Sequence, residues 1–129
     1  QAINNAFGGQ LKRLDPPIHG KLSEIFHNND GIFKSIKNKS FKVTRYHSLV
    51  ANPKTVPKDL IVTAKTKDGT IMGIMHKYLK IYGVQFHPES VLSLNGYRIL
   101  SSFLLVCGYD ILSEEKFNFL EKKLIGNIN

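Results

Sequence analysis

Short apolar runs separated by turn-forming residues fill the chain up to His87. Apolar and β-branched side chains in such runs suit a pleated, half-buried surface. Strands are therefore expected over residues 41–50, 60–64, 71–76 and 81–87. Asp68-Gly69 lies between the second and third of these runs and is typical of a tight hairpin turn, so this part of the chain is expected to form antiparallel sheet.

After His87 the apolar residues recur at helical spacing instead. One helix is expected over residues 92–105, with Ser93 or Asn95 as its N-cap. A last helix is expected to begin after Ser113. It carries two glutamates in its first turn and two lysines in its last, an arrangement that complements the helix dipole.

The start of the chain has a less regular pattern. Residues 1–6 predict a helix that is already under way at the first residue and that Gly8 and Gly9 end. Pro16-Pro17 predicts an irregular connector, and Asn-Asn-Asp-Gly at 28–31 predicts a turn. No internal repeat or linker divides the sequence, so a single domain is expected.

Composition narrows the class of protein. The chain has 129 residues, of which 42% are hydrophobic and 22% charged, as in globular domains. The most apolar stretch, residues 99–107, is far shorter than a membrane span, and no secretory signal is visible. A single cysteine fits a reducing compartment, so the cytoplasm or a plastid stroma is expected, with no membrane association.

The net charge of +8 introduces a basic nucleic-acid-binding module as an alternative function. The basic residues are 15 lysines and only 3 arginines, however. Phosphate and base recognition usually relies on the bidentate arginine fork. Lysine, asparagine and isoleucine are all frequent, as in proteins from AT-rich genomes, and we therefore do not expect nucleic acid to be the partner.

One segment, residues 83–90, carries candidate chemistry. Residues i and i+2 of a strand project to the same side, so His87 and Glu89 are expected to lie together. Pro88 favours an extended backbone at His87. A carboxylate on one ring nitrogen leaves the other nitrogen as a base, which supplies two of the three groups of a nucleophile–His–acid triad. The spacing alone leaves open a chance pairing of two strand-end residues.

Segments that occur in order along the chain resemble the class I glutamine amidotransferases. They are QAINNAFGG at 1–9, HGK at 19–21, RYHSL at 45–49, the Asp-Gly hairpin at 68–76 and VQFHPES at 84–90. The resemblance runs from Gln1 to about Leu105 and is greatest to the glutaminase components of anthranilate synthase and of aminodeoxychorismate synthase. It implies an α/β fold: the C-terminal part of a flavodoxin-like domain, with a mixed sheet and flanking helices. Residues 1–129 would form one partial domain, with 106–129 as a C-terminal helical tail.

The same resemblance implies roles residue by residue. His87 would be the general base, and Glu89 would orient it. Gln1 would help to bind substrate glutamine, and Ser48 and Leu49 would hold the backbone end of that glutamine. No metal or organic cofactor is implied. The implied partner is a chorismate-binding synthase subunit, in a heteromeric complex, that receives the ammonia. Three further histidines are expected to be hydrogen-bonded structural residues and not catalysts: His19, His47 and His76.

The resemblance places the attacking cysteine four positions before Gln1. The single cysteine of the chain, Cys107, is expected to be buried on the apolar face of a helix and not to replace it. Two interpretations remain open. The sequence is part of a longer, ordinary enzyme, which the start within a helix favours, or it is a truncated and catalytically silent protein that binds a partner subunit.

Overall fold

A computed structural model describes residues 1–110 and 113–126. Its helices and strands are α1 (Ala2–Ala6), β1 (Leu11–His27), β2 (Ser40–Ala51), β3 (Leu60–Thr66), β4 (Ile71–His76), β5 (Tyr82–Val84), α2 (Gly96–Val106) and α3 (Glu114–Gly126). Two short 3-10 turns, Gly31–Phe33 and Pro53–Thr55, follow β1 and β2. The parts of the expected tail at 111–112 and 127–129 lie outside the described residues.

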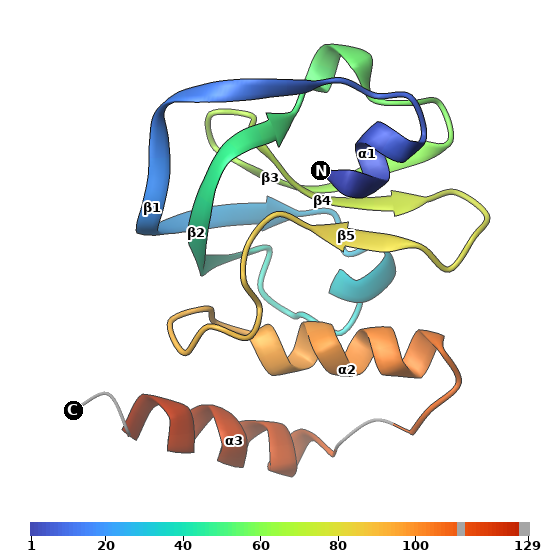
Figure 1. The fold of residues 1–129 in the computed structure, drawn as a ribbon. Coiled ribbons are helices and arrows are strands. Elements are labelled where there is room, and N and C mark those ends of the chain that lie inside the picture. Colours follow the sequence, from blue (N-terminus) through green and yellow to red (C-terminus); the bar gives the residue numbers. More distant parts are fainter. Residues whose placement is uncertain (111–112, 127–129) are drawn as a thin grey trace.

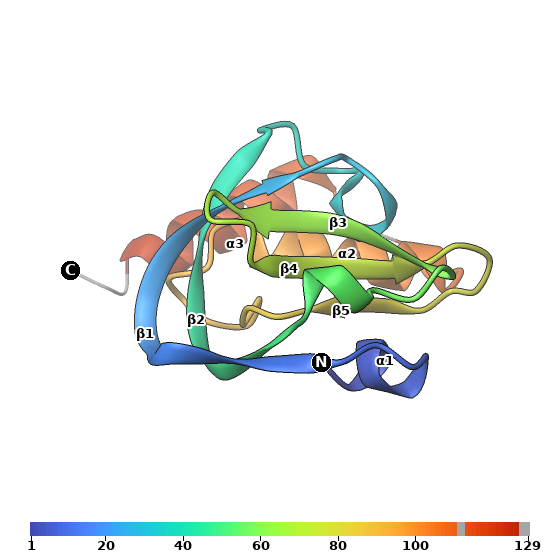
Figure 2. The same cartoon turned by 90° about the horizontal axis from the view of Figure 1, so that it is seen from above.

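The five strands form one curled sheet in the order β2-β1-β3-β4-β5, and all four pairings between described strands are antiparallel. β1 is long enough to bend, so it pairs with β2 along its length and with β3 only at its end (Figures 1 and 2). The expected α/β class with flanking helices is confirmed. The antiparallel stretch that the resemblance predicts makes up all of the described sheet.

The expected connector at Pro16-Pro17 is wrong, because β1 continues through both prolines. The prolines instead interrupt the pairing of the strand. The β1–β2 register shifts between Arg13 and Ile18, and it shifts again near Gly20, whose φ is +64°. Proline cannot donate a ladder hydrogen bond, so the strand bulges where the two prolines stand.

The sheet separates two apolar clusters. The larger one lies between the sheet and α2, where Ile99 of α2 packs with the aromatic rings of Phe33, Phe41 and Phe86. The smaller one lies against α1, whose Ile3 contributes to it. α2 crosses below the sheet in Figure 1. The segment that connects β5 to α2 is hydrogen-bonded to the edge of β2.

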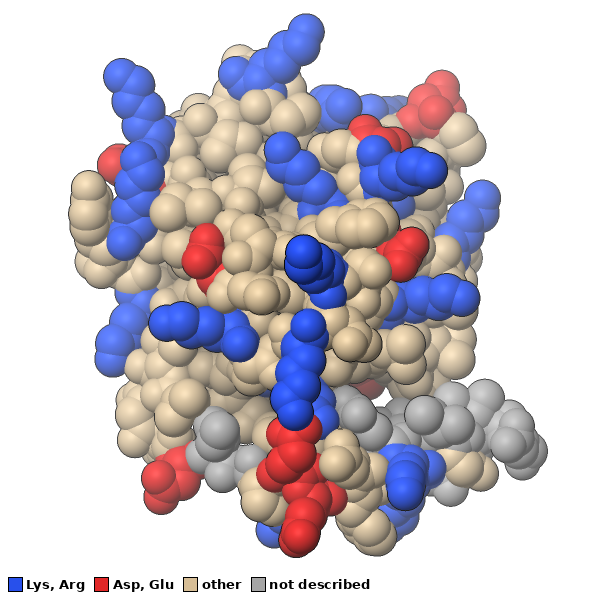
Figure 3. Space-filling view, turned by 180° about the vertical axis from the view of Figure 1, so that it is seen from behind, with Lys and Arg blue, Asp and Glu red and all other residues tan. Residues whose placement is uncertain are grey.

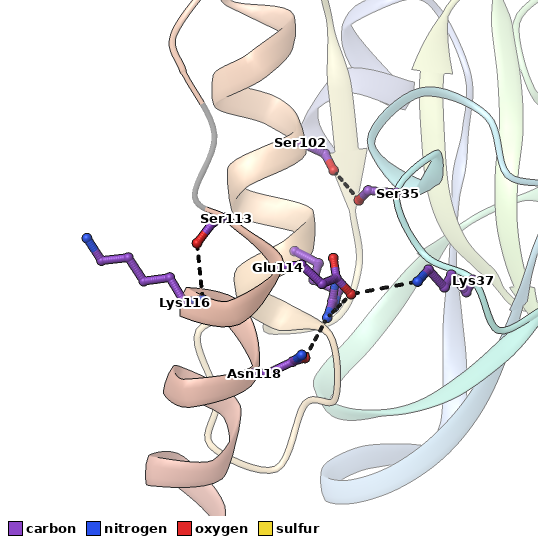
Figure 4. Close-up of polar contacts among 8 residues, drawn as sticks. Ser35, Lys37, Ser102, Ser113, Glu114, Lys116 and Asn118 are labelled. Carbon is purple, nitrogen blue, oxygen red and sulfur yellow. Dashed lines mark hydrogen bonds and ion pairs between the residues drawn. The ribbon is translucent and has the colours of Figure 1, made fainter.

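The helix α3 runs back alongside α2 on the side away from the sheet (Figure 1). Arg98 of α2 donates two hydrogen bonds to Glu114 of α3, at 3.0 and 3.1 Å, and its guanidinium lies over the ring of Phe117. Lys37 also reaches the Glu114 carboxylate, at 3.9 Å (Figure 4). The Ser113 hydroxyl accepts from the backbone N–H of Lys116, as expected of an N-cap.

Three local expectations fail. The strand expected over 81–87 ends at Val84, and the helix expected over 92–105 begins only at Gly96. Both differences have one cause, because residues between these two points bond to the edge of β2 instead of continuing their own elements. Cys107 is exposed, since it follows the last residue of α2 and so leaves the apolar face. No helix within the described residues is long and apolar enough to span a membrane.

Candidate active site

The loop that follows β5 is hydrogen-bonded to the outer edge of β2, which is one of the two edge strands of the described sheet. Thr44 of β2 accepts at its carbonyl from the backbone N–H of His87, at 3.2 Å. The backbone N–H of Thr44 donates to the Ser93 hydroxyl at 3.0 Å, and that hydroxyl donates to the His87 carbonyl at 2.6 Å. These three bonds close a ring that fixes the backbone of His87 against the sheet.

His87 and Glu89 are brought together by the turn that begins at His87. The backbone N–H of Ser90 donates to the His87 carbonyl at 3.2 Å, which closes the turn around Pro88. Nδ1 of His87 lies 2.7 Å from Oε1 of Glu89. The two side chains therefore meet as the sequence predicts, although on a turn and not on a strand.

The ionisation of Glu89 fixes the tautomer of His87. The pKa of the Glu89 carboxyl lies below its ordinary value, first because its own backbone N–H donates to it and then because of the bond to His87. An ionised carboxylate can only accept, so Nδ1 of His87 carries the proton. Nε2 of His87 then presents a lone pair, and no hydrogen bond from another described residue occupies it. The His87 side chain is 43% exposed, which leaves this nitrogen accessible.

Tyr46 of β2 contacts the ring of His87. The two ring centroids are 5.4 Å apart and the rings are nearly perpendicular, at 88°. Side chains alternate across a strand, so Ser48 shares the face of Tyr46 and is exposed on the His87 side of β2. Tyr46 is not among the site residues expected from the sequence. The sequence did offer one indication of it, because Tyr46 stands two residues before Ser48 and so shares the same face of the strand.

Gln1 and Leu49, both expected in the substrate site, also lie together. The side-chain Nε2 of Gln1 donates to the backbone carbonyl of Leu49 at 3.1 Å. This bond links α1 to the end of β2, which are 48 residues apart in the sequence. The structure thus gathers Gln1, Ser48 and Leu49 at the end of the strand that also carries Tyr46.

The three histidines expected to be structural have structural surroundings. Nδ1 of His76 accepts from two backbone N–H groups, and His19 lies edge-on to Tyr46. His47 is buried and hydrogen-bonded within β2. Among the described residues, no group of three or more His, Cys, Asp or Glu side chains is placed to hold a metal ion.

The described residues on the face seen in Figure 3 show no basic stripe of the kind that tracks a phosphate backbone. On the face seen in Figure 3, lysine and arginine side chains stand apart from one another, with acidic side chains between them. This distribution gives the nucleic-acid alternative no support on that face.

Comparisons with a family model and with individual proteins agree on one family for this chain. The family described as glutamine amidotransferase class-I matches residues 1–107. Anthranilate synthase component 2 of Mycobacterium tuberculosis is 48% identical over 109 residues, which are 84% of this chain and 47% of that protein. Aminodeoxychorismate synthase component 2 of Escherichia coli is 47% identical over 104 residues, which are 81% of this chain and 55% of that protein. The chain thus spans about half the length of these relatives.

Solved structures agree on the fold. A putative GMP synthase protein from Thermoplasma acidophilum has a TM-score of 0.74 and 22% identity, over 93% of this chain and 55% of that one. A glutamine amidotransferase from Thermotoga maritima has a TM-score of 0.59 and 16% identity, over 96% of this chain and 53% of that one. The match of the family covers α1 to α2 and leaves α3 outside it.

Proposed function

The chain belongs to the class I glutamine amidotransferases, and we propose that it carries the general base and part of the glutamine site of a glutaminase that supplies ammonia for anthranilate synthesis. The observation that carries the proposal is the bond between Nδ1 of His87 and Oε1 of Glu89 at 2.7 Å, with Nε2 left open. In this role Glu89 holds the imidazole, and His87 moves protons.

In the proposed reaction Nε2 of His87 takes the proton of a cysteine thiol, and the resulting thiolate attacks the side-chain amide carbon of glutamine. The tetrahedral intermediate collapses as His87 gives a proton to the departing nitrogen, which leaves as ammonia and produces a thioester. Nε2 of His87 then takes a proton from water, the hydroxide attacks the thioester, and glutamate leaves as the thiolate is restored. No residue of the described site supplies this thiolate. Cys107 is exposed at the end of α2, and in the family pattern the nucleophile stands ahead of Gln1.

The edge of β2 suits the backbone end of glutamine. Backbone groups of Lys42 and Thr44 point outward from this edge, because both bond to the loop after β5. Since outward-facing residues alternate along an antiparallel strand, Tyr46 and Ser48 continue that row beyond the loop. We propose that the Ser48–Leu49 backbone, with Gln1 beside it, holds the α-amino and carboxylate groups of the substrate.

The ammonia would pass to a chorismate-binding synthase subunit in a heteromeric complex, so that it is not protonated in bulk water. Relatives named for this component of anthranilate synthase support the tryptophan branch. A second candidate is the folate branch, which relatives named aminodeoxychorismate synthase component 2 support at 45–47% identity. We place the protein in the cytoplasm or a plastid stroma, on the basis of its single cysteine.

The test uses the complete polypeptide that contains these residues, together with its synthase subunit. His87→Gln is expected to lower glutamine-dependent product formation at least about 100-fold, because proton transfer by a positioned side chain contributes that much or more. Product formation from an added ammonium salt is expected to continue, because the synthase subunit itself is unchanged. His19→Gln is the matched control, since His19 is exposed and also lies edge-on to the ring of Tyr46.

Full glutamine-dependent turnover in the His87→Gln complex would overturn the assignment of the base. A wild-type complex that assembles without releasing glutamate would leave the catalytically silent binding role in its place. Pairing the polypeptide with each of the two kinds of synthase subunit, and identifying the aminated product, decides between the tryptophan and folate branches.

A further inference from the structure

The backbone at Ser48 lacks the support of a regular sheet ladder. In the described β1–β2 register Leu49 pairs with Arg13 and His47 pairs with Ile18, which leaves Ser48 opposite the bulge. Bulges of this kind often lie beside active sites, where they release a backbone segment from regular pairing. The ladder resumes at Leu49, so at Ser48 the position of the Ser48–Leu49 peptide also depends on contacts other than the ladder.

Side chains fix this segment through the Leu49 carbonyl. Nδ1 of His47 lies 3.1 Å from that carbonyl oxygen, and Nε2 of Gln1 donates to the same oxygen at 3.1 Å. A carbonyl can only accept, so Nδ1 of His47 carries a proton. Two donors from different elements thus hold one carbonyl at the end of β2.

Arg45 decides which nitrogen of His47 carries that proton. Nε of Arg45 donates to Nε2 of His47 at 3.0 Å, and a guanidinium has no lone pair to accept with. Nε2 of His47 must therefore be the acceptor, which leaves the proton on Nδ1. The two side chains meet because residues i and i+2 share a face of β2, and Ser23 of β1 holds the guanidinium from the other end, at 3.3 Å.

Burial keeps this arrangement in one state. Arg45 is 5% exposed and His47 is 7% exposed. The pKa of His47 lies below its ordinary value because of burial and then because of the nearby Arg45 charge. The lowered pKa favours the neutral ring, which keeps the single tautomer that Arg45 selects.

We propose that His47 is a positioning residue of the glutamine site: held by Arg45, it donates to the Leu49 carbonyl and so aligns the Ser48–Leu49 backbone for the α-amino and carboxylate groups of glutamine. This inference rests on the function proposed above. It assigns the two residues different roles: His47 of β2 acts on substrate binding, while His87, in the loop bonded to β2, acts on proton transfer.

Three variants of the complete polypeptide test the proposal, with KM and kcat for glutamine as the readouts. His47→Leu removes the donor and is expected to raise KM about tenfold, the effect of one buried hydrogen bond, with kcat within about threefold of wild type. His47→Asn places an amide N–H where Nδ1 stood and is expected to keep KM within about threefold. The amide of His47→Gln extends to the position of Nε2 and is expected to behave like leucine.

If His47 had a role in folding alone, these variants would have lower melting temperatures, but the KM of the Asn variant would not differ from the KM of the Leu and Gln variants. If His47→Leu does not fold, the ratio of KM between the Gln and Asn variants decides, because both carry an amide. A ratio of about five or more supports the proposal, and equal values overturn it. A KM for His47→Leu within twofold of wild type also overturns it. Failure of the underlying function is distinct, since the wild-type complex would then release no glutamate.

Discussion

Replacing Gly96 by alanine tests whether the contact between α2 and the turn at His87 sets the catalytic geometry. Gly96 is the first residue of α2 and is buried against that turn. A Cβ atom at Gly96 would lie 1.9 Å from the carbonyl oxygen of Pro88. Real Cβ atoms essentially never come within 3.0 Å of another heavy atom, so the Pro88 carbonyl or the helix would have to move by about 1 Å.

The size of the effect follows from where Pro88 stands. It lies between His87 and Glu89, so a shift of about 1 Å disturbs the bond that orients the base, and a displacement of that size at a reacting group costs about 100-fold in rate. Overpacking costs about 1–3 kcal/mol, against a gain of about 1 kcal/mol from alanine in a helix. We expect kcat/KM to fall about 100-fold and the free energy of unfolding to fall by up to about 2 kcal/mol.

The assay measures glutamate release from glutamine and unfolding in urea, both on the complete polypeptide. Gly126→Ala of α3 is the control, because a Cβ there meets no atom of the described residues within 4 Å. Its helix gain is unopposed, so stability should rise by no more than about 1 kcal/mol, with kcat/KM unchanged. Wild-type kcat/KM in Gly96→Ala, or a gain in stability like that of the control, would refute the steric argument.

Three further expectations concern other parts of the molecule. Cys107→Ser should leave kcat and KM for glutamine unchanged, because Cys107 is exposed at the end of α2, and a tenfold loss of turnover would place it in the site. The Thr66 hydroxyl lowers the pKa of Asp68 below its ordinary value of 3.8, so Asp68 stabilises the fold above that pH and loses its contribution as the pH falls through the lowered pKa. Acid titration of unfolding should thus show Asp68→Asn losing less stability than wild type, by under about 1 kcal/mol since Asp68 is exposed, and equal losses would contradict this. Phe117→Ala removes a ring that is 5% exposed against Arg98 and should weaken the attachment of α3 by about 3 kcal/mol. Limited proteolysis should then cut residues 113–126 faster while kcat/KM stays unchanged, and an unaltered cleavage rate would show that the ring does not hold the helix.

Local sequence patterns were sufficient for the hairpin and for β4, since alternation and an Asp-Gly turn are properties of neighbouring residues. The strand over 71–76 has the predicted bounds, and Gly69 has the positive φ, +83°, that the turn needs. The ends of β5 and α2 could not be predicted in this way. They depend on the edge of β2, about forty residues earlier, where Thr44 and Lys42 bond to the loop between them.

The pairing of His87 with Glu89 was predicted from the wrong local structure, and the reason is geometric. A strand places residues i and i+2 on one side, but here a turn closed by Ser90 brings the same two side chains together. Ser93 or Asn95 was expected as the helix N-cap. Asn95 takes that position, without a side-chain cap bond, and Ser93 instead bonds to both His87 and Thr44. No pattern within the segment shows that a serine will bridge a loop to a distant strand.

The alternation of β2 connects these observations in one strand. On one face Arg45 and His47 are buried and hold the backbone, while on the other face Tyr46 and Ser48 are exposed towards His87. The edge of the same strand accepts the loop that carries His87. A one-residue slip of β2 would exchange its two faces, placing the tyrosine in the interior and the arginine beside the base. The register of β2 against β1 therefore decides, at the same time, how the base is held and which side chains face it.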